Sequence, residues 1–206
     1  MEFALNLFGE RCKAQHGMTA TCPQCSGLMV PKCGRLVMHH WAHEANECDC
    51  DPWWEPECIW HRGWKELVPE EQREVSRAGH RADIVRTDGT VVELQHSSIS
   101  LADIAEREAA YGRMVWLFDG RDISVERLIL RNRDRYYTFR WKHPRKHYGA
   151  CSKPVYIDLG ENVFRMKRLH LSGGPPYRGW GRLAPRWVFE QWLTESTQKR
   201  VERFVA

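Results

Sequence analysis

The stretch that decides the fold is His80-Arg-Ala-Asp83-Ile-Val-Arg-Thr-Asp88-Gly-Thr-Val-Val-Glu93-Leu-Gln95. Asp-Gly between two apolar runs is a strong hairpin signal, so we expect strands over about 80–86 and 91–96. Side chains alternate between the two faces of a strand. If the apolar side chains share one face, Asp83 and Glu93 lie together on the other.

Two carboxylates held side by side repel each other, and a bound divalent cation relieves that repulsion. Oxygen ligands of this kind suit Mg²⁺ or Mn²⁺. The sequence therefore raises the hypothesis of a magnesium or manganese site at Asp83 and Glu93. The alternative is an ordinary hairpin whose polar face is exposed to water.

The positive charge of the chain is concentrated in its C-terminal part. Residues 1–130 hold 14 Lys and Arg against 21 Asp and Glu, whereas residues 131–206 hold 17 against 6. Aromatic residues such as Tyr136 and Trp180 are interleaved with these basic residues. The combination suits a polyanion whose bases can stack, so we expect a nucleic-acid partner. The alternative is a charged surface over an aromatic core.

No apolar run in the 206 residues approaches the roughly 20 that a membrane helix needs, so we expect no membrane partner. The N-terminal residues lack the basic start and the cleavage site of a signal peptide, and we expect a cytoplasmic protein. In that compartment the eight cysteines are better interpreted as metal ligands or thiols than as disulfides.

A paired-ligand pattern lies near the N-terminus, in Cys22-Pro-Gln-Cys25 followed by His40-Trp-Ala-His43. Two cysteines and two histidines at these spacings can close the tetrahedral site that Zn²⁺ prefers. We therefore expect a zinc site formed by Cys22, Cys25, His40 and His43. Four protein ligands leave no position for a water molecule, so the zinc is expected to be structural.

The choice among the zinc ligands stays open at this point. His39 can replace His40, and Cys33 can replace one of the ligands. Cys48 and Cys50 can supply a second pair, with Cys58 as a further candidate.

The remaining pattern predicts a helix over 55–68 that carries Glu57, His61 and Lys65 on one stripe, at i, i+4 and i+8. Ser100 is a suitable N-cap for a helix over about 101–112. Strands are expected over 114–118, 136–141, 154–158 and 163–169, and a C-terminal helix is expected over 185–204.

In order, these elements are a helix with Glu57, a hairpin with Asp83 and Glu93, a helix and a strand. This α-β-β-(β)-α-β order is similar to the core of PD-(D/E)XK nucleases. The paired Cys and His residues precede it, and the runs Glu57-Cys-Ile-Trp-His61-Arg-Gly-Trp-Lys65 and Glu93-Leu-Gln95-His-Ser-Ser-Ile-Ser100 lie within it. With these motifs the chain resembles the CoiA-like competence protein family, over about residues 19–118.

The resemblance implies an α/β (α+β) fold with a PD-(D/E)XK restriction-endonuclease-like core over 51–130. A small zinc knuckle would occupy the N-terminal segment 1–50. A basic, aromatic-rich extension would occupy 131–206.

The resemblance also implies that Asp83 and Glu93 bind a catalytic Mg²⁺ or Mn²⁺, with Glu57 assisting directly or through water. Gln95 stands where the usual motif has Lys, and an amide carries no charge. His61 or Lys65 could supply the missing positive charge or act as the base, and His80 is a further candidate.

Three functions follow as hypotheses, and the net charge of +11 over residues 131–206 counts against the third, a purely structural zinc protein that binds other proteins. The first is a metal-dependent DNA endonuclease or exonuclease that hydrolyses phosphodiester bonds in DNA processing or recombination. The second is a non-catalytic nucleic-acid-binding accessory protein that retains the nuclease fold. The Asp83–Glu93 pair favours the first, and Gln95 favours the second.

Overall fold

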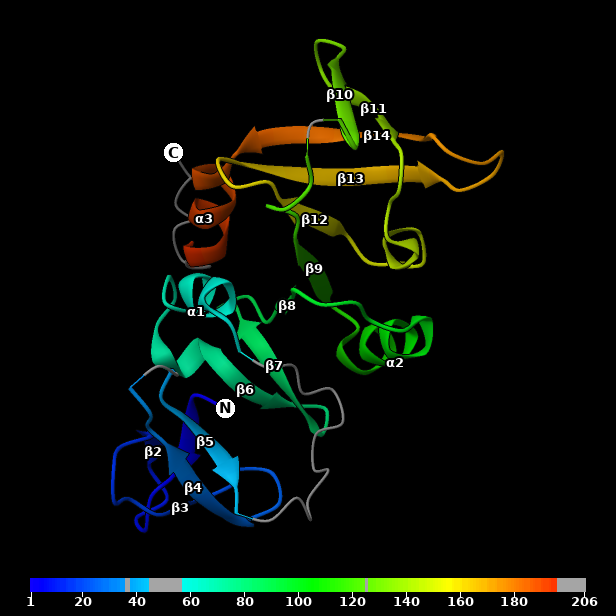
Figure 1. Cartoon of the computed structure of the whole chain (residues 1–206). Coiled ribbons are helices and arrows are strands. Elements are labelled where there is room, and N and C mark those ends of the chain that lie inside the picture. Colours follow the sequence, from blue (N-terminus) through cyan, green and yellow to red (C-terminus); the bar gives the residue numbers. More distant parts are fainter. Residues whose placement is uncertain (36–37, 45–56, 125, 196–206) are drawn as a thin grey trace. The chain divides into compact units, whose positions relative to one another are not determined.

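The structure is a computed structural model that describes residues 1–35, 38–44, 57–124 and 126–195 (Figure 1). The described residues form three α-helices and two β-sheets, which confirms the expected mixture of helix and strand. The chain divides into two compact units, Met1–Glu57 with Glu74–Ala82, and Cys58–Arg73 with Asp83–Ala206. The division of the sequence into segments 1–50, 51–130 and 131–206 stays a prediction.

The first unit contains a five-stranded antiparallel sheet in the order β2-β1-β3-β4-β5. Its strands are β1 (Phe3–Leu5), β2 (Arg11–Lys13), β3 (Ala20–Thr21), β4 (Leu28–Lys32) and β5 (His40–His43). Trp41 lies in the centre of a small core with Met29 and Cys33. The Trp41 indole donates to the carbonyl of Cys12 at 2.9 Å, so its polar atom is satisfied in the core.

The second sheet has nine strands in the order β10-β11-β14-β13-β12-β9-β8-β7-β6, and the division between the two units falls within β6 and β7. Strands β8, β9 and β12 are parallel neighbours. The strand bounds are β6 (Arg73–Arg77), β7 (His80–Val85), β8 (Val91–Gln95), β9 (Met114–Asp119), β10 (Leu128–Asn132), β11 (Tyr137–Trp141), β12 (Val155–Asp158), β13 (Asn162–His170) and β14 (Tyr177–Pro185).

The helices are α1 (Ile59–Lys65), α2 (Leu101–Tyr111) and α3 (Arg186–Thr194), with short 3₁₀ turns at Glu70–Gln72 and Lys146–Gly149. Ser100 caps α2 as expected, because its hydroxyl accepts the Asp103 amide at 3.0 Å. Helices α1 and α3 bury aromatic side chains in one apolar core with β7, β8 and β9. That core contains Trp60, Trp64, Ile84, Leu94, Leu117 and Phe189.

Helix α1 is shorter than the helix expected over 55–68. Cys58 has extended backbone angles, and its carbonyl accepts the first intrahelical bond from Arg62 at 3.1 Å. Glu57 therefore precedes the helix and does not share a stripe with His61 and Lys65. At the other end, Pro69 disfavours helical geometry at the residue before it. The expected C-terminal helix over 185–204 is observed as the shorter α3, which ends at Thr194 before the extended Glu195, and residues 196–206 lie outside the described residues.

Glu108 joins α2 to the loop before β12. Its carboxylate accepts the Trp116 indole N–H at 2.9 Å and the backbone amides of Ser152 and Lys153 at 3.0 Å each. Burial raises the pKa of this carboxyl, but the hydrogen bonds from Ser152, Lys153 and Trp116 outweigh burial and hold the pKa below its ordinary value. The ionised side chain therefore stabilises the fold.

We expect Glu108→Ala to lower the free energy of unfolding by about 2–3 kcal/mol, because the buried donors around it lose their acceptor. Urea denaturation at neutral pH measures the effect. Glu106→Ala is the matched control, since Glu106 is exposed on the same helix and its replacement should change stability by less than about 0.5 kcal/mol. Equal stability of the two variants would contradict this role for Glu108.

Candidate functional site

The β7–β8 hairpin turns at Asp88-Gly89 as predicted, with the Arg86 amide donating to Thr90 at 3.0 Å and Gly89 at a φ of 79°. The paired positions of the ladder are Val85 with Val91 and Ile84 with Val92. Next to these pairs, side-chain carboxylates rather than backbone carbonyls accept the backbone amides. The Leu94 amide donates to Asp83 Oδ2 at 3.0 Å, and the Asp83 amide donates to Glu93 Oε1 at 3.3 Å.

Two cations hold the other oxygens of these carboxylates. Lys65 Nζ, from the end of α1, lies 3.2 Å from Asp83 Oδ1. Arg107, from α2, donates to Glu93 Oε2 at 2.9 Å. The Lys65 and Glu93 side chains are only 4% and 3% exposed, respectively. Charges of opposite sign are thus paired in a buried cluster. The repulsion between the two carboxylates is offset by protein cations, whereas the sequence leads us to expect a metal ion in that role.

Burial raises the pKa of Glu93 to about 7, and the nearby charge of Asp83 acts in the same direction. Arg107 and the Asp83 amide oppose this shift, because they favour the ionised carboxylate. Glu93 therefore exchanges its proton near neutral pH, whereas an ordinary glutamate is ionised there.

The other expected site residues of this unit lie on the same elements. His61 Nε2 donates to the Leu94 carbonyl at 3.2 Å, and its Nδ1 lies 3.1 Å from Cys58 Sγ. Gln95 is buried, and its amide donates to the Ser97 carbonyl at 3.4 Å. His61, Lys65, Asp83, Glu93 and Gln95 all belong to the second unit, whereas Glu57 belongs to the first.

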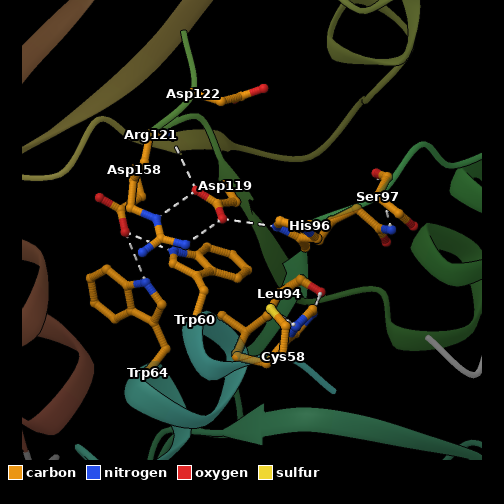
Figure 2. Close-up of polar contacts among 12 residues, drawn as sticks. Cys58, Trp60, Trp64, Leu94, His96, Ser97, Asp119, Arg121, Asp122 and Asp158 are labelled. Carbon is orange, nitrogen blue, oxygen red and sulfur yellow. Dashed lines mark hydrogen bonds and ion pairs between the residues drawn. The ribbon is translucent and has the colours of Figure 1, made fainter. Parts of the chain in front are cut away.

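A second polar network lies at the carboxyl ends of the parallel strands, and sequence reasoning missed it (Figure 2). Asp119 closes β9 and Asp158 closes β12, and the two residues are register partners. Asp119 accepts from His96 Nδ1 at 2.9 Å and from two guanidinium nitrogens of Arg121 at 2.9 and 2.8 Å. Burial raises the Asp119 pKa, but these hydrogen bonds hold it below the ordinary value.

Asp158 is 0% exposed, and one of its oxygens accepts the indole N–H groups of Trp60 at 2.8 Å and Trp64 at 3.0 Å. Arg186 of α3 lies 3.4 Å from the same oxygen. The sequence does carry a signal for this network, since each of the two apolar strands ends in an aspartate. The carboxyl ends of parallel strands meet at one edge of a sheet, which brings such aspartates together.

In the first unit, the ligand atoms of Cys22, Cys25 and His43 all lie within 4.8 Å of one another. Cys25 Sγ is 3.3 Å from His43 Nε2. Backbone amides of Gln24 and Gly27 donate to the sulfurs of Cys22 and Cys25, each at 3.4 Å. Amide donors of this kind stabilise negative charge on sulfur, which is the state that binds a metal ion.

Gly27 fits closely against this group, because a Cβ at position 27 would lie 3.1 Å from Cys25 Sγ. A side chain there would crowd the sulfur.

His40 lies outside this group, for a geometric reason. Both histidines are in strand β5, where residues three positions apart point to opposite faces. His40 Nδ1 instead lies 2.8 Å from the Met38 carbonyl.

The alternative ligands also lie elsewhere. Cys33 is buried in the core of the first unit, and His39 is exposed with its ring 6.4 Å from that of His16. Cys58 contacts His61 in the second unit. Cys48 and Cys50 fall outside the described residues.

Comparisons of the chain with protein-family models, with curated proteins and with solved structures gave no match. No helix in the described part of the chain is long and apolar enough to cross a membrane.

The raised pKa of Glu93 predicts that stability falls with rising pH. The native state holds a proton on Glu93 up to about pH 7, whereas the unfolded chain releases it near the ordinary value of 4.5. The native state therefore binds more protons between these values, and the free energy of unfolding decreases by at most about 1.4 kcal/mol per pH unit.

Urea denaturation across this pH range in EDTA measures the dependence. We expect Glu93→Gln to remove this part of the slope and Glu106→Gln to retain it. An unchanged slope in Glu93→Gln would show that Glu93 is ionised throughout.

Proposed function

We propose that this chain is a metal-dependent nuclease that hydrolyses phosphodiester bonds in DNA. The observation that carries the proposal is the pair of carboxylates at the interruption of the β7–β8 ladder, with Lys65 in contact with Asp83. The order α1, β6, β7, β8, α2, β9 and the parallel pairing of β8 with β9 support a PD-(D/E)XK-like core. The motifs by which the chain resembles CoiA-like competence proteins point to the same chemistry.

Lys65 supplies the positive charge that Gln95 lacks. The usual motif places a lysine two residues after the second carboxylate, where this chain has Gln95. Here the ammonium group comes from the end of α1 and lies 3.2 Å from Asp83 Oδ1. In this role Lys65 offsets negative charge on the scissile phosphate, and Gln95 helps to orient the attacking water.

The donor set fits a hard divalent cation. Each carboxylate oxygen of Asp83 and Glu93 accepts one protein donor and has a further lone pair. Asp83 and Glu93 would hold Mg²⁺ or Mn²⁺, which supplies an activated water and stabilises charge on the phosphate oxygens. Glu93 must first lose its proton, so its raised pKa favours activity above about pH 7.

The second candidate function is nucleic-acid binding without cleavage. The observation that favours it is the pairing of both carboxylates with protein cations, Asp83 with Lys65 and Glu93 with Arg107. A fold that had lost its metal would balance these charges in this way. Metal-dependent cleavage separates the two functions.

Asp83→Asn should slow cleavage of labelled single-stranded or duplex DNA by about 100-fold or more, because it removes a metal ligand. Asparagine keeps an oxygen that can accept the Leu94 amide, so the hairpin should remain folded. Glu106→Gln removes an exposed carboxylate of α2 and should leave the rate unchanged. The assay compares Mg²⁺, Mn²⁺ and EDTA, and tryptophan fluorescence checks folding of each variant.

Cleavage that persists in EDTA or in Asp83→Asn would contradict the metal assignment. Salt-sensitive DNA binding with no cleavage in any metal would favour the non-catalytic function instead.

We also propose that Cys22, Cys25 and His43 hold a structural Zn²⁺. Two sulfurs and an imidazole nitrogen within 4.8 Å of one another are the donor set that this ion prefers, and the amide–sulfur hydrogen bonds support it. They account for three of four tetrahedral positions. Of the candidates that the sequence provides for the fourth position, Cys48 and Cys50 are those that the described residues do not place elsewhere.

Cys25→Ser should abolish stoichiometric zinc binding and lower the Tm of the first unit by about 5 °C or more, since metal binding contributes directly to folding. Metal analysis of the purified protein and thermal melts with and without a chelator measure both effects. Cys12→Ser is the matched control, because Cys12 lies in β2 of the same unit and outside the ligand group. Full zinc content in Cys25→Ser would exclude this ligand set.

A further inference from the structure

A groove of about 710 Å³ lies over β10, β11 and β14 in the second unit. The proposed catalytic residues are not among those that line it. Its exposed lining side chains include four arginines and two aromatic residues. They are Arg131, Arg133, Tyr136, Arg140, Arg178 and Trp180.

The strand register gathers four of these side chains, Arg131, Arg140, Arg178 and Trp180, on one face of the sheet. Thr138 of β11 lies between Arg131 of β10 and Trp180 of β14. In the next row of the same face, Arg140 pairs with Arg178. The alternate residues of β11 point the other way, and Phe139 is buried in the core. The face is therefore basic and aromatic over an apolar layer.

The four arginines are exposed, and none of them forms an ion pair with a described carboxylate. Their charge is thus available to a ligand. His170 of β13 lies opposite Arg178 and lines the same groove. A groove that concentrates positive charge in this way attracts a polyanion and releases its counterions.

Two aromatic rings line the groove together with these arginines. Tyr136 and Trp180 are 41% and 40% exposed, and their ring centroids are 5.9 Å apart in an edge-to-face arrangement. Beneath them the strand lies close to the core, because a Cβ at Gly179 would lie 2.4 Å from Phe139 Cζ. Large exposed rings beside arginines form a platform on which unpaired bases stack.

We propose that this groove binds single-stranded nucleic acid, with bases stacked on Trp180 and Tyr136 and phosphates held by the arginines. Charge complementarity selects a polyanion. The aromatic rings select one whose flat bases are accessible, which excludes the stacked interior of a duplex. Binding here does not depend on the proposed cleavage reaction, so either proposal can fail without the other.

The test is binding of fluorescent oligo-dT of about 12 nucleotides to the full chain in EDTA, followed by anisotropy. We expect Trp180→Ala to weaken binding by about tenfold or more, and Trp180→Phe to restore most of it. Trp187→Ala is the matched control, because Trp187 is 62% exposed on α3 and lies outside the groove. An abasic oligonucleotide of equal length separates stacking from charge, and its affinity should be the same for Trp180→Ala and the unaltered chain.

The arginines are tested through salt dependence. Arg140→Gln combined with Arg178→Gln should reduce the slope of log K against log salt by about 1.4, since each phosphate contact to a single strand contributes about 0.7. Arg35→Gln, an exposed position in the first unit, should leave the slope unchanged.

Equal affinity of Trp180→Ala and Trp187→Ala for oligo-dT would overturn the proposal. So would duplex DNA that binds as tightly as the single strand, or polyglutamate that competes as well as oligo-dT. Asp83→Asn should bind oligo-dT normally, so a loss of cleavage without a loss of binding concerns the proposed nuclease site alone.

Discussion

The second unit depends on the exchange of backbone for side-chain hydrogen bonds where β7 and β8 separate. Asp83 accepts the Leu94 amide, which a continued ladder would have paired with a carbonyl, and Glu93 accepts the Asp83 amide. A buried carboxylate is costly unless a cation and hydrogen-bond donors accompany it. Lys65 and Arg107 meet that requirement, and they connect the hairpin to α1 and α2.

Other buried acids connect elements of the second unit in the same way. Glu108 links α2 to the loop before β12, and Asp158 links β12 to α1 through two indoles. Each acid is surrounded by donors from elements far apart in sequence. Such networks specify one arrangement of elements, because a shifted helix would leave buried donors and acceptors without partners. In the first unit, two sulfurs and an imidazole nitrogen converge instead.

The parts of the fold that follow from local chemistry could be predicted from the sequence. Asp88-Gly89 fixes the hairpin turn, and Ser100 fixes the start of α2. Alternation along the strands also indicates that Asp83 and Glu93 lie together. The parts that depend on distant contacts could not be predicted. The spacing of His40 and His43 suits a helix turn or a loop, but β5 is a strand and turns the two rings apart. The neighbourhood of Asp119 and Asp158 comes from the pairing of β9 with β12, and the indoles that contact Asp158 come from α1, so local sequence does not encode either.

The strand order has a consequence for how the chain is made. β9 pairs with β8 at once, but its other neighbour, β12, is synthesised only after the β10–β11 hairpin. The β10–β11 hairpin joins the rest of the sheet only through β14, which is the last strand to be synthesised. During translation the chain therefore exposes two open strand edges, and β9 carries the large apolar rings of Trp116 and Phe118. Open apolar edges template pairing with other chains, so we expect nascent chains that stall before β12 to be the most prone to aggregation.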